Sequence, residues 1–161
     1  MNIFETTRIK LKNQALRIDR YDLDRLWGGF FVLDENQAQE FADIYFEGLD
    51  VGPLRIAGKL SPKILLVRPE AHLSWQYHHR RAETWRVVEG PVGIVRSPTD
   101  VEGELVSYEA GETIVLEKGE RHRLIGLENW GVVAEFWQHT DPYHPSDEDD
   151  IVRVEDDYAR K

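Results

Sequence analysis

The sequence predicts an all-β fold, built either as a sandwich or as a closed antiparallel barrel. The chain has 161 residues, which suits one domain with one core. Short runs rich in β-branched and aromatic residues follow one another, and glycine or proline separates them. These runs cover residues 64–67, 73–78, 84–88, 92–95, 104–108, 113–116, 122–125 and 132–137. Many short strands divided by turn residues are typical of such folds.

Helices are expected before the first of these strands. Asp34 followed three residues later by Gln37 is a helix-start pattern. Apolar residues then recur at helical spacing at Phe41, Ile44 and Tyr45. The pattern predicts a helix over 35–47, and a shorter helix is expected at about 20–26.

These patterns divide the chain into three parts of one domain. Residues 1–54 are interpreted as a helical extension that packs on the barrel and can close over its mouth through Trp27. Residues 55–139 are predicted to form the barrel itself. Residues 140–161 are polar and acidic, and we expect them to run along the barrel surface as a tail.

Composition excludes several classes of function. The formal net charge is −10, and so acidic a surface repels phosphate backbones, so we expect no nucleic-acid partner. Residues 1–14 lack the apolar core of a signal peptide, and the longest aliphatic run, 64–67, is too short to span a bilayer. We therefore predict a cytoplasmic protein without membrane contact.

The chain has no cysteine, so a bound metal would need histidine, carboxylate or amide ligands.

Four side chains are spaced so that they can converge inside a barrel. Gln76 and His78 are two residues apart in a predicted strand and therefore point to the same face. Glu83 opens the returning strand after a turn, and His122 begins a later strand. Each residue alone is common in strands and turns, and only the joint spacing points to a site. Two imidazoles, a carboxylate and an amide oxygen suit a divalent cation with a coordination position left open.

The spacing of these residues resembles the two motifs of the cupin family. The first motif is matched by Gln76-x-His78-x4-Glu83-x6-Gly90, and the second by Gly111-x5-Glu117-x-Gly119-x2-His122. Glutamine replaces the usual first histidine, which is similar to the mannose-6-phosphate isomerases, whose zinc is held by Gln, His, Glu and His. Segments 73–85, 119–124 and 148–158 resemble the type II enzymes, in particular the isomerase module at the C-terminal end of bifunctional mannose-1-phosphate guanylyltransferases. The resemblance covers residues 60–161.

The resemblance implies a jelly-roll cupin barrel and an aldose–ketose isomerase acting on mannose 6-phosphate. It implies one divalent metal ion, zinc first, with manganese, iron, nickel or cobalt as alternatives. Arg81 matches an arginine that acts in catalysis in the family. The reaction also needs a general base, and His79 or a carboxylate from Glu135 or the tail are the candidates. The guanylyltransferase part of the bifunctional enzymes has no counterpart in this sequence, so nucleotide-sugar synthesis is not expected.

Positive charge near the two motifs predicts where a phosphate group binds. Lysine and arginine gather in and beside both motif turns of a chain that is otherwise acidic. We assign substrate binding to Lys63, Arg86, Lys118 and Arg123.

The alternatives to this function are an isomerase of another sugar, an iron-dependent dioxygenase, which Gln76 disfavours, and a sugar-binding domain without turnover. Segment 132–137 carries apolar residues on consecutive positions, which indicates a homodimer paired through strands.

Overall fold

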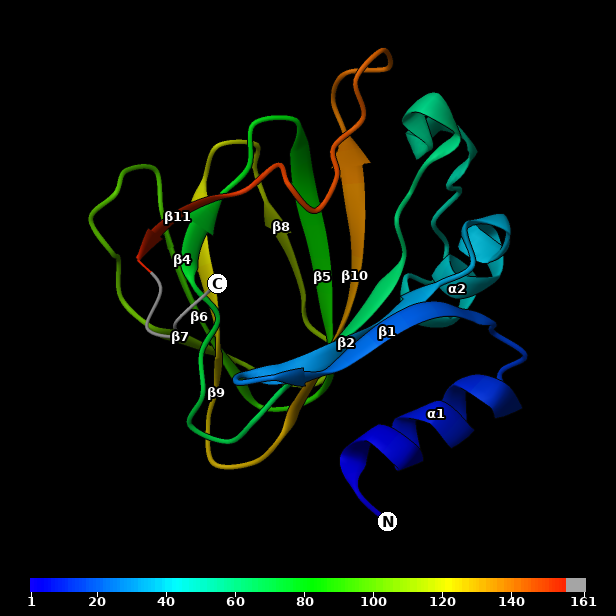
Figure 1. The fold of residues 1–161 in the computed structure, drawn as a ribbon, viewed down its shortest axis with the longest axis horizontal. Helices are drawn as coiled ribbons and strands as arrows, with labels where there is room; N and C mark the ends of the chain where they lie inside the picture. Colours follow the sequence, from blue (N-terminus) through cyan, green and yellow to red (C-terminus); the bar gives the residue numbers. More distant parts are fainter. Residues whose placement is uncertain (156–161) are drawn as a thin grey trace.

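Two antiparallel sheets form the body of the protein, as the computed structural model shows for residues 1–155 (Figure 1). The six-stranded sheet has the order β1-β2-β3-β10-β5-β8, and the five-stranded sheet has the order β11-β4-β9-β6-β7. The strands are β1 Ile18–Arg25, β2 Gly28–Leu33, β3 Lys63–Val67, β4 Trp75–Tyr77, β5 Arg81–Glu89, β6 Val92–Ser97, β7 Val106–Tyr108, β8 Thr113–Leu116, β9 Arg121–Gly126, β10 Gly131–His139 and β11 Val152–Glu155. The all-β prediction is confirmed, and the eight predicted strands are all present, seven of them with shifted ends.

Two α-helices pack outside the six-stranded sheet. Helix α1 spans Ile3–Asn13 and α2 spans Ala38–Tyr45, with short 3₁₀ turns at Glu35–Gln37, Gly52–Leu54 and Ile56–Gly58. The helix predicted over 35–47 is confirmed as the first of these turns followed by α2. None of the helices in the described part of the chain is long and apolar enough to cross a bilayer.

Strand β3 is buried on both of its faces, which explains its unbroken aliphatic run. Ile64 and Leu66 point outward into a core that includes Phe41 of α2. Leu65 and Val67 point inward to a second core between the two sheets. A strand covered on both faces needs apolar residues at every position rather than at alternate ones.

The prediction of a helix at residues 20–26 is wrong, because residues 20–25 belong to β1. This strand pairs antiparallel with β2, and Ile18 lies opposite Leu33. Pairing with a neighbouring strand overrides the weak helical spacing of the segment. The first 54 residues therefore add two strands to the sheet as well as helices. The division of the chain at residues 54 and 139 stays a prediction.

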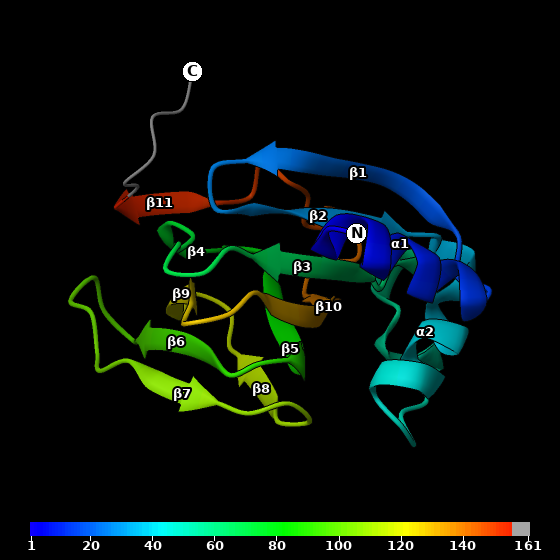
Figure 2. The ribbon, with the colours of Figure 1, turned by 90° about the horizontal axis from the view of Figure 1, so that it is seen from below.

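Two features of the chain's C-terminal third bear on the other expectations. Strand β11 pairs with β4, so the tail adds a strand beside the segment that carries Gln76 (Figure 2). The end of the segment 148–158, which resembles the type II enzymes, lies outside the described residues.

Strand β10 lies between β3 and β5, and its residues 131–137 are all buried. Segment 132–137 therefore presents no outer face for a dimer contact.

Candidate metal centre

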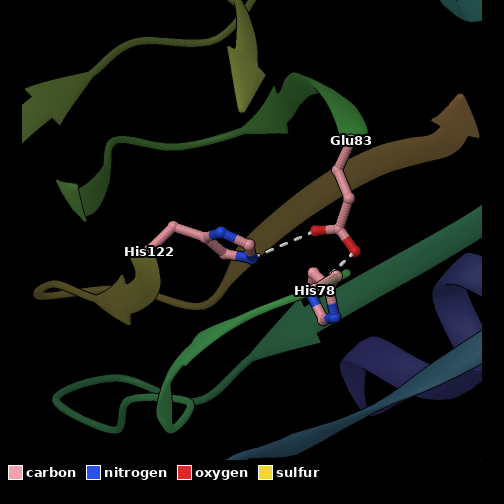
Figure 3. A group of neighbouring side chains, drawn as sticks. All are labelled: His78, Glu83 and His122. Carbon is pink, nitrogen blue, oxygen red and sulfur yellow. Dashed lines mark ion pairs between the residues drawn. The ribbon is translucent and has the colours of Figure 1, made fainter. Parts of the chain in front are cut away.

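Three buried side chains meet inside the barrel: His78 after β4, Glu83 in β5 and His122 in β9. Nε2 of His78 lies 3.3 Å from Oε2 of Glu83, and Nε2 of His122 lies 3.2 Å from Oε1 of the same carboxylate (Figure 3). The candidate ligand atoms all lie within 4.8 Å of one another. Strand alternation therefore brings three of the four predicted ligands to one point.

Both imidazoles are held with Nε2 facing the carboxylate. Nδ1 of His78 lies 2.7 Å from the carbonyl oxygen of Asp150, and Nδ1 of His122 lies 3.2 Å from that of Glu120. A carbonyl oxygen can only accept a hydrogen bond, so in each neutral ring Nδ1 carries the proton and Nε2 presents a lone pair. Burial lowers the pKa of His78 to about 4, so this ring is neutral at pH 7.

This arrangement fits a divalent cation. The lone pair of His122 Nε2 faces the Glu83 carboxylate and repels it, and a cation between the two atoms would remove the repulsion. Nε2 of His78 also lies 3.3 Å from Nη2 of Arg81, which can donate to it. Nε2 of His122 is buried and has no hydrogen-bond partner among residues 1–155, which is uncommon for a polar atom in a folded protein. A ligating histidine usually donates its other N–H to a carbonyl or carboxylate, as both rings do here. Histidine nitrogen and carboxylate oxygen are ordinary ligands of zinc.

Gln76 lies beside the cluster. It is buried in β4 and is the register partner of His122 in β9. It also lines the same cavity as Glu83. The structure therefore brings the fourth predicted ligand next to the other three, and coordination by its amide oxygen stays a prediction.

Arg81 fixes the carboxylate of Glu83 from the first position of β5. Its Nε donates to Oε2 of Glu83 at 2.8 Å, and its Nη1 donates to Ser146 Oγ and to the Asp147 carbonyl oxygen. Its guanidinium lies over the ring of Trp137, 3.5 Å from the ring centre. Burial opposes ionisation of Glu83, but the positive charge of Arg81 counters it, and the pKa of Glu83 lies well below its usual value. Arg81 thus keeps Glu83 charged and correctly oriented.

A cavity of about 90 Å³ adjoins the cluster. Its apolar side includes Trp27, and closure of the barrel mouth by the first 54 residues stays a prediction. Its polar lining consists of Arg25, Lys63, Ser74, Gln76, Arg81, Glu83, Glu135, Glu148 and Arg153. A cavity that adjoins a metal-type cluster and is lined by both cationic and carboxylate side chains is suited to a small, polar ligand.

Glu135 is a second buried carboxylate in this cavity. Its two oxygens accept hydrogen bonds from the indole N–H groups of Trp85 and Trp137, at 2.7 and 2.9 Å. Burial raises the pKa of Glu135 to about 7, and the charge of Glu83 adds to the shift. A carboxylate with a pKa near neutrality, held rigidly beside a metal-type cluster, can both accept and return a proton.

Three of the four cations assigned to phosphate binding lie elsewhere. Arg86 points to the outer face of β5 and donates to the carbonyl oxygen of Tyr45 at 3.0 Å. Arg123 is the neighbour of His122 in β9, and its Nε donates to the carbonyl of Leu73 at 2.8 Å. Lys118 is exposed in the turn between β8 and β9. In the described part of the chain none of the three lines the cavity, whereas Lys63 does.

His79, one of the candidate bases, is also placed away from the cluster. Its side chain is exposed and lies against the ring of Tyr77, with the ring centres 5.4 Å apart. Its backbone N–H and that of Arg80 donate to the carboxylate of Asp150, each at 2.9 Å. The turn that carries His79 is thus fixed by the tail, and the residue itself does not enter the cavity lining.

Several residues of the cavity are not predicted by any pattern in the sequence. Arg25 comes from the end of β1, and Glu148 and Arg153 come from the tail. These segments lie more than a hundred residues apart in the sequence, and no local pattern links them. The acidic composition of the tail gave no hint that Glu148 contacts a buried lysine.

Comparison with known proteins agrees with the fold. The chain resembles the capsular polysaccharide assembling protein CapF from Staphylococcus aureus, with a TM-score of 0.54 and 16% identity over 87% of this chain and 34% of that one. It is 31% identical to the xanthan biosynthesis protein XanB of Xanthomonas campestris pv. campestris over 71% of this chain and 22% of the relative. It is 28% identical to a mannose-1-phosphate guanylyltransferase of Salmonella montevideo over 95% of this chain and 26% of the relative. The chain thus spans about a quarter of the length of these curated relatives.

Fold and site together define a cupin barrel with a His–Glu–His cluster in its interior. Residues 52–156 match the family described as mannose-6-phosphate isomerase C-terminal. The chain belongs to this family, and the resemblance predicted from the two motifs is confirmed.

Proposed function

We propose that this protein is a metal-dependent aldose–ketose isomerase that interconverts mannose 6-phosphate and fructose 6-phosphate. The observation that carries the proposal is the His78–Glu83–His122 cluster, whose Glu83 lines one cavity together with Glu135. The family description supports both the type of reaction and the substrate. Zinc is the first candidate for the metal, because its usual ligands are histidine and carboxylate.

Gln76, His78, Glu83 and His122 would hold the ion. A bound divalent ion would act as a Lewis acid that stabilises negative charge developing on the substrate oxygens. Arg81 keeps Glu83 in place. The lining of tryptophan, phenylalanine and leucine side chains lowers the local water content, which strengthens these electrostatic interactions.

Glu135 is the residue we assign to proton transfer. The reaction removes a proton from the carbon beside the carbonyl and returns one to the neighbouring carbon, so a single group can serve both steps. Glu135 lines the cavity next to the cluster, and its position is fixed by two indole N–H groups. The other candidate base, His79, is exposed outside the cavity.

The test of this function is a coupled assay on metal-loaded protein. Mannose 6-phosphate is supplied, and fructose 6-phosphate formation is followed, with free mannose and other sugar phosphates in parallel. We expect turnover of mannose 6-phosphate above all other sugars. Turnover of unphosphorylated sugars alone would keep an isomerase and refute the phosphate substrate. Sugar binding without any turnover would instead support a non-catalytic sugar-binding domain.

We further propose that the protein is a homodimer. Strands β7 and β8 are the edges of their sheets and carry exposed apolar residues, among them Val106 and Val115. Exposed sheet edges with apolar side chains favour pairing with a second chain. Light scattering at micromolar concentration should give twice the chain mass of 18.8 kDa. A monomer mass would contradict the proposal.

A further inference from the structure

A carboxylate from the tail occupies the cationic rim of the cavity. Oε1 of Glu148 lies 3.0 Å from Nζ of Lys63 and 3.6 Å from Nη2 of Arg20. Burial opposes ionisation of Glu148, but Lys63, Arg81 and Arg20 outweigh it, and the pKa of Glu148 lies below its usual value. Glu148 is therefore an anion held by cations from other strands.

The two partners of this ion pair differ in how firmly they are held. The side chain of Lys63 is 7% exposed, and its Nζ lies 4.9 Å from the ring centre of Phe30 and 4.8 Å from that of Trp137. The side chain of Glu148 is 47% exposed. Lys63 is thus fixed by packing, whereas the Glu148 carboxylate can rotate into water at little cost. The cation stays in place when its partner leaves.

The cavity dimensions place the outer end of a ligand at this rim. The space beside the metal-type cluster is about 90 Å³, below the roughly 300–1,000 Å³ usual for ligand sites. Two further hollows, of about 290 and 430 Å³, adjoin it, and Glu148 lines all three. Arg20 lines both outer hollows, and Arg25 and Arg153 line the inner cavity and the larger hollow. A ligand that reaches the cluster must extend past Glu148.

We propose that Glu148 occupies an anion site which the phosphate group of the substrate takes over, with Lys63 and Arg20 as the cations that exchange one partner for the other. This inference rests on the proposed function, because it assumes a phosphorylated sugar with its reacting carbons at the cluster. A phosphate carries up to two charges and three terminal oxygens, so it can contact Lys63 and Arg20 together. Arg25 and Arg153 lie close enough to the same rim to strengthen its hold. The contact seen here makes phosphate compete with a built-in carboxylate and so weakens phosphate binding.

The experiment removes the competing charge and measures phosphate binding directly. Glu148→Gln keeps the shape of the side chain and loses its charge. Asp149→Asn, one residue along on the same hollow, removes the same charge without touching the Lys63 contact and is the matched control. Isothermal titration of the full-length, metal-loaded protein with inorganic phosphate gives the dissociation constant. We expect binding about tenfold tighter in Glu148→Gln, and less than about twofold tighter in Asp149→Asn, since a charge-assisted contact is released only in the first.

Lys63→Met tests whether the effect runs through the lysine. It preserves the length and apolar packing of the side chain, and phosphate binding should fall at least about tenfold. In this background Glu148→Gln should no longer tighten binding. Phosphate that binds to the metal contributes equally to all variants and cancels in the comparison. Equal tightening in Glu148→Gln and Asp149→Asn, or an unchanged effect in the Lys63→Met background, would overturn the inference.

Kinetics separates this inference from the proposed function. In the isomerase assay, Glu148→Gln should lower KM for mannose 6-phosphate by a similar factor, whereas Asp149→Asn should change this KM less than about twofold. If the phosphate affinities change as expected but no sugar phosphate is isomerised, the anion site stands and the isomerase proposal falls. If mannose 6-phosphate is isomerised with the same KM in Glu148→Gln and the parent protein, the isomerase stands and the exchange at Glu148 is wrong.

Discussion

His122→Ala is expected to lose most of its bound metal and to reduce isomerase activity at least about a hundredfold. His122 contributes one of four predicted ligands, and its Nε2 is one of the buried side-chain atoms that have no hydrogen-bond partner among the described residues. Removal of this metal ligand would leave an incomplete site and an opening through which water can reach the ion. Elemental analysis of purified protein should give about one divalent ion per chain in the parent and close to none in the variant.

Thermal unfolding gives a second readout of the same loss. An ion that binds the folded chain alone raises the melting temperature, so a chelator should lower the Tm of the parent protein. The chelator should have no effect on His122→Ala. The control is His144→Ala, which removes an exposed imidazole from the tail and should retain both the metal and the chelator effect. Full metal retention in His122→Ala would contradict the predicted site.

The alternation of side chains along strands explains why the ligands could be predicted and why the phosphate cations could not. Gln76 and His78 share a face because they are two residues apart, and the structure places both inside. The same rule puts Arg86, three residues after Glu83, on the opposite face. Arg123 directly follows His122 and faces away for the same reason. Residues that are close in sequence can therefore lie on opposite faces of one sheet.

Other parts of the site depend on contacts that no local pattern encodes. The pairing of Gln76 with His122 follows from the register of β4 and β9, which is set by loops between distant segments. Glu148 meets Lys63 because the tail crosses the mouth of the barrel before β11 pairs with β4. The sequence of β1 wrongly predicts a helix because the partner strand β2, rather than the sequence of β1 itself, determines the conformation.

Glu135→Gln is expected to lower kcat at least about a hundredfold, the range usual for loss of a general base, and to leave the metal content unchanged. The side chain lines the cavity without being one of the predicted ligands, and its oxygens accept hydrogen bonds from two indoles. An amide of the same size fills the same space but cannot accept a proton from carbon. Glu128→Gln, an exposed change in the turn between β9 and β10, is the control and should behave as the parent protein.

The pH dependence identifies this role more specifically than the rate alone. Burial raises the pKa of Glu135 to about 7, with repulsion from Glu83 as the next cause, so the base is increasingly protonated and inactive as the pH falls below that value. The kcat/KM of the parent protein should therefore fall on the acid side, at a pH of about 7 or lower, because a cation bound to Glu83 would offset the repulsion. The residual activity of Glu135→Gln should lack this acid limb.

The raised pKa of Glu135 also means that the folded state is favoured when Glu135 is protonated, and that this stabilisation is lost as the pH rises through the folded pKa. Glu135→Gln should remove this loss, so the melting temperature of the metal-free variant should fall less than that of the parent between pH 5 and pH 8. An acid limb that persists unchanged in Glu135→Gln would assign the proton transfer to another group.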